Sequence, residues 1–327
     1  VENAKRNKKN IDELPLFDNF STSEKLRIAA YFSSIKKFEK GDYIVEKGQR
    51  DRTFFIILKG EAIVSIDTNK SPLATITHND FFGEISYLCD TPRSTHIICK
   101  TPCTVLELGD SALSRLGVII REKFKDMILF KVIDRLDQQN KTLAEFKERD
   151  DDRYAEIYVD PSRLKPTPLK DTENNRRVIK SYIKNTPFFE DFSEYEINRL
   201  SSVFTHIRKI PPHYPLIQQG TRGKVFFVLL SGEVAVVKGE GRKKVLLATL
   251  KKSSVFGEVS FLTNEPRTTH IIASKDCVVL MINQNLMTFM GAETREKYKD
   301  AVLKILLTRL EGQNAIIQKY KSSVYFN

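Results

Sequence analysis

The apolar residues of the chain recur at two different spacings. Two short segments have the period of an α-helix, Ser23–Phe32 and Tyr195–Phe204. A longer segment begins at Arg121, and its apolar residues stand four positions apart at Phe124, Ile128, Val132 and Leu136. This spacing gives the segment one apolar face, so we expect an amphipathic helix that closes the domain before it.

Between these helical segments lie apolar runs that are too short for helices. The run from Phe54 reads FFIILKGEAIVSI and is rich in residues that favour strands. Glycines interrupt such runs in both halves of the chain, at Gly48, Gly60, Gly220 and Gly232. Many short strands separated by turns are typical of a β-barrel or jelly roll. We therefore expect a mainly β fold with flanking helices.

The chain contains an internal duplication. The sequence FGEISYLCDTPRSTHII begins at Phe82, and FGEVSFLTNEPRTTHII begins at Phe256. From Phe82 to Lys147 the chain aligns without a gap to Phe256–Lys321, at an offset of 174. Upstream the match continues at an offset of 172, so LPLFDNFS from Leu14 corresponds to TPFFEDFS from Thr186. Two copies of this length indicate duplicated domains rather than a solenoid.

The duplication sets the domain boundaries. An acidic run and three prolines separate the two copies and are typical of a linker. We expect a first domain over residues 1–147, a linker over 148–175 and a second domain over 176–327. Each domain is expected to be a jelly-roll barrel flanked by helices.

Composition and charge narrow the function classes. The 327 residues include 53 Lys and Arg against 42 Asp and Glu, a net charge of +11, but the lysines are spread along the chain. This spread favours a solvated basic surface over a nucleic-acid face. The longest apolar runs are too short to span a bilayer, so we expect no membrane span. The basic N-terminus lacks the apolar stretch of a secretory signal.

The four cysteines, Cys89, Cys99, Cys103 and Cys277, form no CxxC pair. They have no histidine at metal-ligand spacing, so we expect no metal, no disulfide framework and a cytoplasmic location. No nucleophile with an oriented base, paired carboxylates or glycine-rich ATP loop is apparent. We therefore expect a protein that is not an enzyme and that needs no cofactor.

The repeated motif has the chemistry of a sugar-phosphate site. Gly83 and Gly257 allow backbone N–H groups to approach an anion closely. Arg93 and Arg267 offer planar forks of donors that match two phosphate oxygens. An ionised glutamate only accepts hydrogen bonds, so Glu84 and Glu258 suit the hydroxyls of a ribose. The alternative is that each glutamate pairs with its arginine beside a tight turn.

FGE followed by PR resembles the phosphate-binding cassette of cyclic nucleotide-binding domains. The whole arrangement resembles the tandem regulatory subunits of cyclic-nucleotide-dependent protein kinases. The resemblance implies that Glu84 and Glu258 hold the ribose 2′-hydroxyl and that the two arginines neutralise the cyclic phosphate. It also implies that backbone N–H groups near Ile85, Ser86, Val259 and Ser260 complete the cradle. Each domain would then bind one molecule of cAMP or cGMP.

The chain departs from that family in three places. The family usually carries an acidic residue four positions after the strand-turn glycine, where this chain has Arg52 and Lys224. No pseudosubstrate of the form Arg-Arg-x-Ser/Ala stands near the N-terminus, and Arg176–Arg177 is followed by valine and isoleucine. The linker is also longer than the usual join. These departures put the positioning of the arginines and the inhibition of a kinase in doubt.

Polar residues after each arginine bear on the choice of base. Ser94 and Thr95 follow Arg93, and Thr268 and Thr269 follow Arg267. Relatives that select cAMP usually have a small apolar residue directly after the arginine, whereas a hydroxyl resembles relatives that select cGMP. The hydroxyl could instead bond only to phosphate or backbone, so both nucleotides stay open.

Family precedent also places an aromatic lid residue over the base. The C-terminal IIQKYKSSV resembles a capping segment, which makes Tyr320 the expected cap of the second site. For the first site the repeat favours Phe146, and the family precedent favours Tyr195 from the second domain. His96 and His270 follow the cassettes at matched positions and are expected to be structural.

Three functions remain. The first is a receptor that releases a kinase catalytic subunit when ligand moves its lids. The second is a scaffolding protein that kept the fold. The third is the regulatory fragment of a larger single-chain kinase. A DNA regulator is not expected, because only a few residues follow Tyr320.

Overall fold

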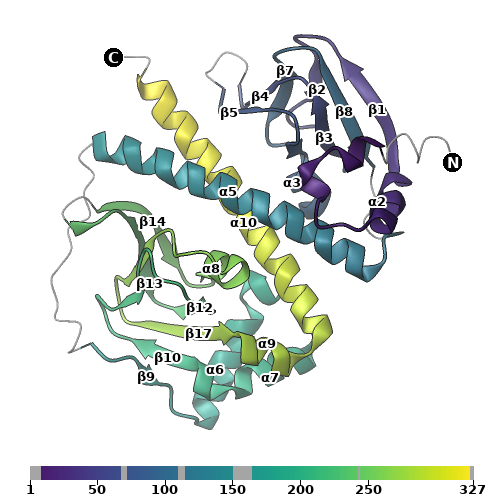
Figure 1. Cartoon of the computed structure of the whole chain (residues 1–327). Helices are drawn as coiled ribbons and strands as arrows, with labels where there is room; N and C mark the ends of the chain where they lie inside the picture. Colours follow the sequence, from purple (N-terminus) through teal and green to yellow (C-terminus); the bar gives the residue numbers. More distant parts are fainter. Residues whose placement is uncertain (1–8, 68–71, 110–114, 150–163, 242–243, 325–327) are drawn as a thin grey trace. The chain divides into compact units, whose positions relative to one another are not determined.

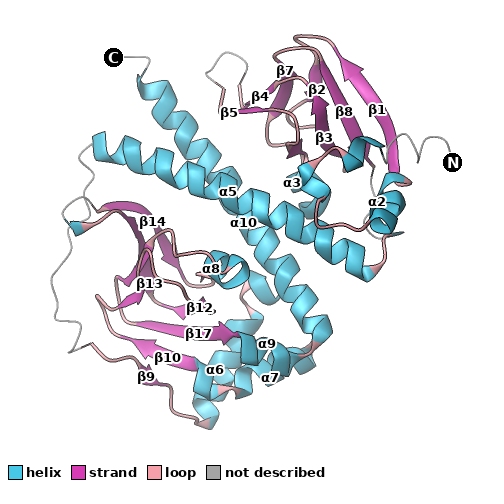
Figure 2. Ribbon diagram, viewed as in Figure 1, coloured by secondary structure: helices cyan, strands magenta, loops and turns pink. Residues whose placement is uncertain are grey.

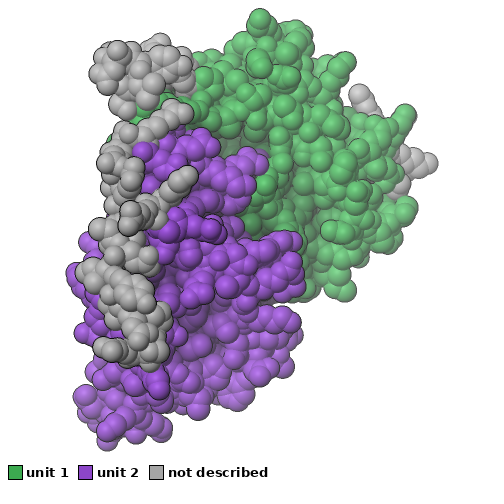
Figure 3. All heavy atoms as spheres, turned by 60° about the vertical axis from the view of Figure 1, so that its left-hand side comes forward, with its two compact units in different colours: residues 1–134, 307–327 green, residues 135–306 purple. Residues whose placement is uncertain are grey.

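The computed structural model describes residues 9–67, 72–109, 115–149, 164–241 and 244–324. The chain divides into two compact units, which are coloured separately in Figure 3. The first unit comprises residues 1–134 and 307–327, and the second comprises residues 135–306. Half of the expected linker, residues 150–163, lies outside the described residues.

The first unit contains two antiparallel four-stranded sheets (Figure 1). One sheet has the strand order β1-β8-β3-β6 and the other β2-β7-β4-β5. The strands are β1 (Phe32–Phe38), β2 (Tyr43–Val45), β3 (Phe54–Lys59), β4 (Ala62–Ser65), β5 (Ala74–Ile76), β6 (Phe81–Phe82), β7 (His96–Cys99) and β8 (Cys103–Leu108). Eight strands in two sheets of this order form a jelly roll, which confirms the predicted fold class.

The second unit repeats this topology. Its sheets have the orders β15-β12-β17-β10-β9 and β11-β16-β13-β14. The strands are β9 (Thr167–Pro168), β10 (Ile207–Ile210), β11 (Pro215–Ile217), β12 (Val225–Ser231), β13 (Glu233–Lys238), β14 (Val245–Lys251), β15 (Val255–Phe256), β16 (His270–Ala273) and β17 (Cys277–Asn283). Apart from β9, each strand has a counterpart in the first jelly roll.

Helices flank the sheets in both units, as Figure 2 shows by colour. The helices of the first jelly roll are η1 (Pro15–Phe17), α2 (Thr22–Ala29), α3 (Glu84–Cys89) and α5 (Val118–Arg149). Those of the second are α6 (Glu173–Lys184), η3 (Pro187–Phe189), α7 (Glu194–Ser202), η4 (Phe204–His206), α8 (Glu258–Thr263), α9 (Gln284–Met290) and α10 (Ala292–Val324). The sequence pattern predicted α2, α7 and the long helix α5, whereas α6 was not predicted. Within the described part of the chain, none of the helices has the length and apolar composition that a bilayer crossing requires.

The short helices α2 and α7 both begin with a capping box. The Ser21 hydroxyl accepts from the Glu24 N–H, and the Glu24 carboxylate accepts from the Ser21 N–H. Ser193 and Glu196 form the same pair at the start of α7. Such a capping box satisfies backbone donors that a helix start leaves open, so the helix begins at a fixed residue.

The jelly-roll cores hold the strand that leads into each cassette. Phe82 at the end of β6 stacks on Phe55, with ring centroids 5.1 Å apart and planes 15° apart. Phe256 and Phe227 form the same stack at 5.3 Å and 15° in the second jelly roll. All four rings are buried. Because the cassette glycine directly follows Phe82 in the first repeat and Phe256 in the second, these contacts fix where each cassette begins.

Candidate functional site

In each repeat a glycine joins a two-residue strand to a six-residue helix. Gly83 lies between β6 and α3 with φ of 83°, and Gly257 lies between β15 and α8 with φ of 82°. Glycine adopts this left-handed conformation without the strain that a side chain would cause. A Cβ atom at Gly83 would also stand 2.6 Å from both Arg93 Nη1 and the Thr53 carbonyl oxygen. The motif glycine therefore lets the backbone lie directly against the arginine.

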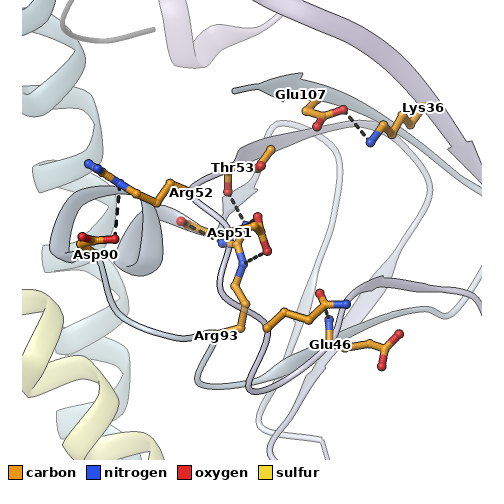
Figure 4. Close-up of polar contacts among 10 residues, drawn as sticks. Lys36, Glu46, Asp51, Arg52, Thr53, Asp90, Arg93 and Glu107 are labelled. Carbon is orange, nitrogen blue, oxygen red and sulfur yellow. Dashed lines mark hydrogen bonds and ion pairs between the residues drawn. The ribbon is translucent and has the colours of Figure 1, made fainter. Parts of the chain in front are cut away.

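Arg93 is buried in the first cassette and is almost fully engaged by the protein (Figure 4). Its Nε donates to Asp51 Oδ2 at 3.1 Å, and its Nη2 donates to Asp51 Oδ1. Nη2 also donates to the Thr53 carbonyl oxygen at 2.7 Å, and Nη1 donates to the Gly83 carbonyl oxygen at 3.2 Å. These four hydrogen bonds use four of the five N–H groups of the guanidinium.

The Asp51 carboxylate is held ionised by this arginine. Burial opposes its ionisation, but the hydrogen bonds and the charge of Arg93 leave the pKa of Asp51 below its ordinary value. The Asp51 side chain is 41% exposed and that of Arg93 is 3% exposed. The first cassette therefore contains a buried cation that is neutralised from its solvent side.

Arg267 occupies the equivalent place in the second cassette in a different electrostatic environment. Its Nη1 donates to the Gly257 carbonyl oxygen, and its Nη2 donates to the Val225 carbonyl oxygen at 2.5 Å. Burial lowers the pKa of Arg267, and the charge of Glu258 opposes that effect. Among the described residues, no carboxylate is hydrogen-bonded to Arg267, and only two of its five N–H groups are used.

Gly223 explains why no described carboxylate is hydrogen-bonded to Arg267. At the offset of 172 it stands where the first repeat has Asp51. A Cβ atom on Gly223 would lie 2.5 Å from Arg267 Nη2, so the arginine fills the space next to the glycine. The second cassette therefore presents a buried cation whose charge an anionic ligand would balance.

Asp51 was not predicted from the sequence as a partner of Arg93. The acidic residue was expected four positions after Gly48, where Arg52 stands, and its absence put the positioning of the arginine in doubt. The structure corrects this for the first domain, because Asp51 is one residue earlier and reaches Arg93. Arg52 instead donates to the Tyr87 carbonyl oxygen at 3.3 Å and lies 3.8 Å from Asp90 (Figure 4). In the second domain the doubt stands, since Gly223 and Lys224 replace the acid.

The other predicted cassette residues lie on the same two turns. Glu84, Ser86, Glu258 and Ser260 are buried, while Ile85 and Val259 are half-buried. Ser94, Thr95, Thr268 and Thr269 are half-buried on the segments that lead into β7 and β16. Their roles toward a ligand stay predictions. The side chains are nevertheless placed on the segment that follows each arginine.

The two histidines of the motif hydrogen-bond to backbone. His96 Nδ1 accepts from the Lys47 N–H at 3.2 Å, and His270 Nδ1 accepts from the Gln219 N–H at 3.2 Å. His270 Nε2 also lies 3.2 Å from the Gly239 carbonyl oxygen. These matched contacts fit the structural role expected of both residues.

The three candidate caps fall in different places. Tyr195 on α7 is 69% exposed, and Arg199 lies over its ring at 5.6 Å. Phe146 on α5 is half-buried and belongs to the unit of the second jelly roll. Tyr320 on α10 is half-buried and belongs to the unit of the first. The assignment of caps to ligands stays a prediction.

Comparison with known families identifies the class of protein. The model of the cyclic nucleotide-binding domain matches residues 35–117 and 207–291, which together cover about half of the chain. The chain therefore belongs to the cyclic nucleotide-binding domain family and contains two such domains in tandem.

Named relatives are regulators and kinases. A cAMP-dependent protein kinase regulatory subunit of Yarrowia lipolytica is 23% identical over 250 residues, 76% of this chain and 52% of that protein. A cGMP-dependent protein kinase of Toxoplasma gondii is 25% identical over 250 residues, 76% of this chain and 19% of that protein. The chain thus spans about half or less of the length of these relatives. The regulatory domain of Toxoplasma gondii PKA, solved with cAMP, aligns with 91% of this chain and 94% of its own length, at 16% identity and a TM-score of 0.34.

Proposed function

We propose that this chain is a cyclic nucleotide receptor that regulates a protein kinase. The observation that carries the proposal is the repeated cassette, in which a buried glutamate and a buried arginine flank a left-handed glycine. The arginine supplies donors for a cyclic phosphate, and the glutamate supplies an acceptor for a ribose hydroxyl. Each domain would bind one cAMP or cGMP, and no catalytic step is assigned to the chain.

The kinase partner is inferred from the relatives. In the proposed mechanism, ligand binding changes the position of the helices around a cassette, and a kinase catalytic subunit is released or activated. A ligand shifts such an equilibrium only by its difference in affinity for the two conformations. A cytoplasmic location is part of the same proposal, because the four free cysteines fit a reducing compartment.

A second candidate is the regulatory fragment of a single-chain kinase. The match to the Toxoplasma gondii kinase favours it, because 76% of this chain corresponds to only 19% of that protein. Both candidates need the same ligand sites. They differ in whether the catalytic domain is a separate chain, which sequence beyond both termini would decide.

Calorimetry tests the ligand sites directly. Titration of the full chain with cAMP or cGMP should show two sites, and Arg93→Ala and Arg267→Ala should each remove one. Each charge-assisted hydrogen bond contributes about 1.5–3 kcal/mol, so adenosine, which lacks the phosphate, should bind at least about 10-fold more weakly. Arg52→Ala is the matched control and should keep both sites. Equal affinity for adenosine and its cyclic phosphate would show that these are not phosphate sites.

The base preference needs a separate titration. Ser94→Ala and Thr268→Ala should lower the affinity for cGMP relative to cAMP if the hydroxyls read the guanine. If both ratios stay unchanged, the hydroxyls bond only to phosphate or backbone. A pull-down of the kinase catalytic subunit with and without nucleotide then tests the regulatory step.

A further inference from the structure

The two long helices α5 and α10 each belong to both compact units. Residues of α5 up to Asp134 belong to the first unit, and those from Arg135 belong to the second. Residues of α10 up to Leu306 belong to the second unit, and those from Leu307 belong to the first. We call residues 135–149 the distal half of α5 and residues 307–324 the distal half of α10. Each distal half is therefore assigned to the unit that contains the jelly roll of the other repeat.

The distal half of α10 contacts the first jelly roll at two points. Lys321 Nζ donates to the carbonyl oxygens of Pro72 and Leu73 at 2.8 and 3.2 Å, just before β5. The Glu311 side chain hydrogen-bonds to Ser94, the residue directly after the cassette arginine. The second contact places the distal half of α10 at the segment where the first ligand would bind.

The distal half of α5 also contacts the second jelly roll at two points, the first of which corresponds to a contact of α10. Lys147 Nζ donates to the Leu246 carbonyl oxygen at 2.6 Å, in β14. Asp137 Oδ1 lies 3.4 Å from Lys238 Nζ at the end of β13. Burial raises the pKa of Asp137, but Lys141 and Lys238 more than offset this and leave it below its ordinary value.

The lysine contact is repeated between equivalent positions. Lys147 and Lys321 are 174 residues apart, as are Asp137 and Glu311. The match at this offset already begins before the cassette, where LATI from Leu73 corresponds to LATL from Leu247, so Pro72 corresponds to Leu246. The lysine of each distal half donates to the equivalent carbonyl oxygen in the jelly roll of the opposite repeat. The pattern is thus reciprocal rather than a feature of one helix.

We infer that the two repeats exchange lids, so that the distal half of α10 covers the first cassette and the distal half of α5 covers the second. Tyr320 then belongs to the first ligand site and Phe146 to the second, the opposite of the pairing predicted from the gapless repeat. The ligand part of this inference rests on the proposed function. Its consequence is that each nucleotide site contains residues of both repeats.

Cross-linking tests the exchange without any ligand. Pairs of cysteines are placed in the full chain, in a Cys89→Ser background that removes the more accessible native thiol. Pro72→Cys with Lys321→Cys and Leu246→Cys with Lys147→Cys should be joined by a short bismaleimide within one chain. The own-repeat pairs, Pro72→Cys with Lys147→Cys and Leu246→Cys with Lys321→Cys, should not be joined.

Peptide mass spectrometry reads the four pairs at low protein concentration. Cross-links in the own-repeat pairs, in no pair, or only between two chains would each overturn the exchange. Because no nucleotide is added, this result does not depend on the proposed function.

Binding measurements then test the caps. In an Arg267→Ala background only the first site is read, and Tyr320→Ala should weaken cAMP or cGMP binding there by about 10- to 100-fold, the effect of losing one stacked base. In an Arg93→Ala background Phe146→Ala should have the larger effect. If Tyr320→Ala weakens the second site instead, the exchange of caps is wrong. If neither background binds either nucleotide, the proposed function fails, and cross-linking alone decides the exchange.

Discussion

Arg93 and Arg267 occupy equivalent positions, yet among the described residues the first donates to a carboxylate and the second only to carbonyl oxygens. The backbone of the two cassettes is nearly the same, with φ of 83° and 82° at the glycines. The difference arises from one substitution, Asp51 against Gly223. After duplication the geometry of the anion site was thus kept, while the charge that faces the anion changed. The positive charge of the arginine is therefore less compensated in the second cassette than in the first before a ligand binds.

The helices that precede the jelly rolls, α2 and α7, also differ, but here the second domain has the additional polar contact. In the first domain Glu24 pairs with Lys123 at 2.8 Å, and in the second Glu196 pairs with Lys297 at 2.7 Å. Glu196 also accepts from the Thr294 hydroxyl at 2.5 Å, where the first repeat has Ile120. The second domain therefore has more hydrogen-bond donors on this carboxylate than the first. Its cassette has fewer hydrogen bonds to the arginine.

The largest expected effect follows from Glu196. Burial opposes its ionisation, but hydrogen bonds from Lys297, Thr294 and Ser193 lower its pKa from 4.5 to about 2. A lowered carboxylate pKa stabilises the fold above the unfolded value, and this stability is lost as the pH falls from 4.5 to about 2. At about 1.4 kcal/mol for each pH unit, Glu196→Gln should lower the free energy of unfolding by about 3 kcal/mol at pH 7.

Hydrogen exchange read by mass spectrometry at α7 and α10 measures this loss in the second domain. The difference between Glu196→Gln and the unmodified chain should shrink as the pH falls through that window. Glu24→Gln is the matched variant in the first domain. If the two variants lower the free energy of unfolding equally at pH 7, the contact with Thr294 adds no stability. The two domains then do not differ in how this carboxylate stabilises them.

The next effect concerns the second cassette. Gly223→Asp places a carboxylate beside Arg267, as in the first domain, and should neutralise the cation that an anionic ligand would meet. Losing one charge-assisted hydrogen bond corresponds to about 10- to 100-fold weaker cyclic nucleotide binding at that site. Titration in an Arg93→Ala background measures the second site alone.

Gly223→Asn separates charge from volume. It adds the same Cβ and a side chain of similar size, so it should reproduce any steric part of the effect without the charge. If the two variants weaken binding equally, crowding of Arg267 is responsible, and the electrostatic difference between the cassettes does not control affinity.

The cassettes are predictable from the sequence because they are local and repeated. Gly83, Glu84 and Arg93 stand within eleven positions, and the second copy confirms their spacing. The partner of Arg93 was missed because Asp51 lies 42 residues away and one place from the expected position. A carboxylate can reach the same guanidinium from adjacent positions of a turn, so spacing alone does not identify it.

The two long helices, each of which divides between the compact units, show a second limit of sequence patterns. The period of α5 predicted a helix that closes its own domain, and a gapless repeat predicted the same arrangement twice. The surface that the distal half of a long helix packs against is decided by tertiary contacts, and local periodicity carries no information on those contacts. The α6 helix was missed for a simpler reason, since its sequence begins within the polar stretch assigned to the linker.

The smallest expected effect is at Asp51 itself, because its side chain is 41% exposed. Breaking a fully buried ion pair costs about 3–5 kcal/mol, but solvent compensates part of the charge here, so we expect Asp51→Asn to lower the stability of the first jelly roll by about 1–2 kcal/mol. The same change frees donors of Arg93 and should make the first cassette bind cyclic nucleotide more tightly. Hydrogen exchange at β3 measures the stability, and titration in an Arg267→Ala background measures the affinity.

Asp90→Asn, which removes an exposed partner of Arg52, is the control and should change neither the stability nor the affinity. If Asp51→Asn destabilises the domain but weakens binding, Asp51 acts mainly by orienting Arg93, and neutralisation is not what distinguishes the two cassettes.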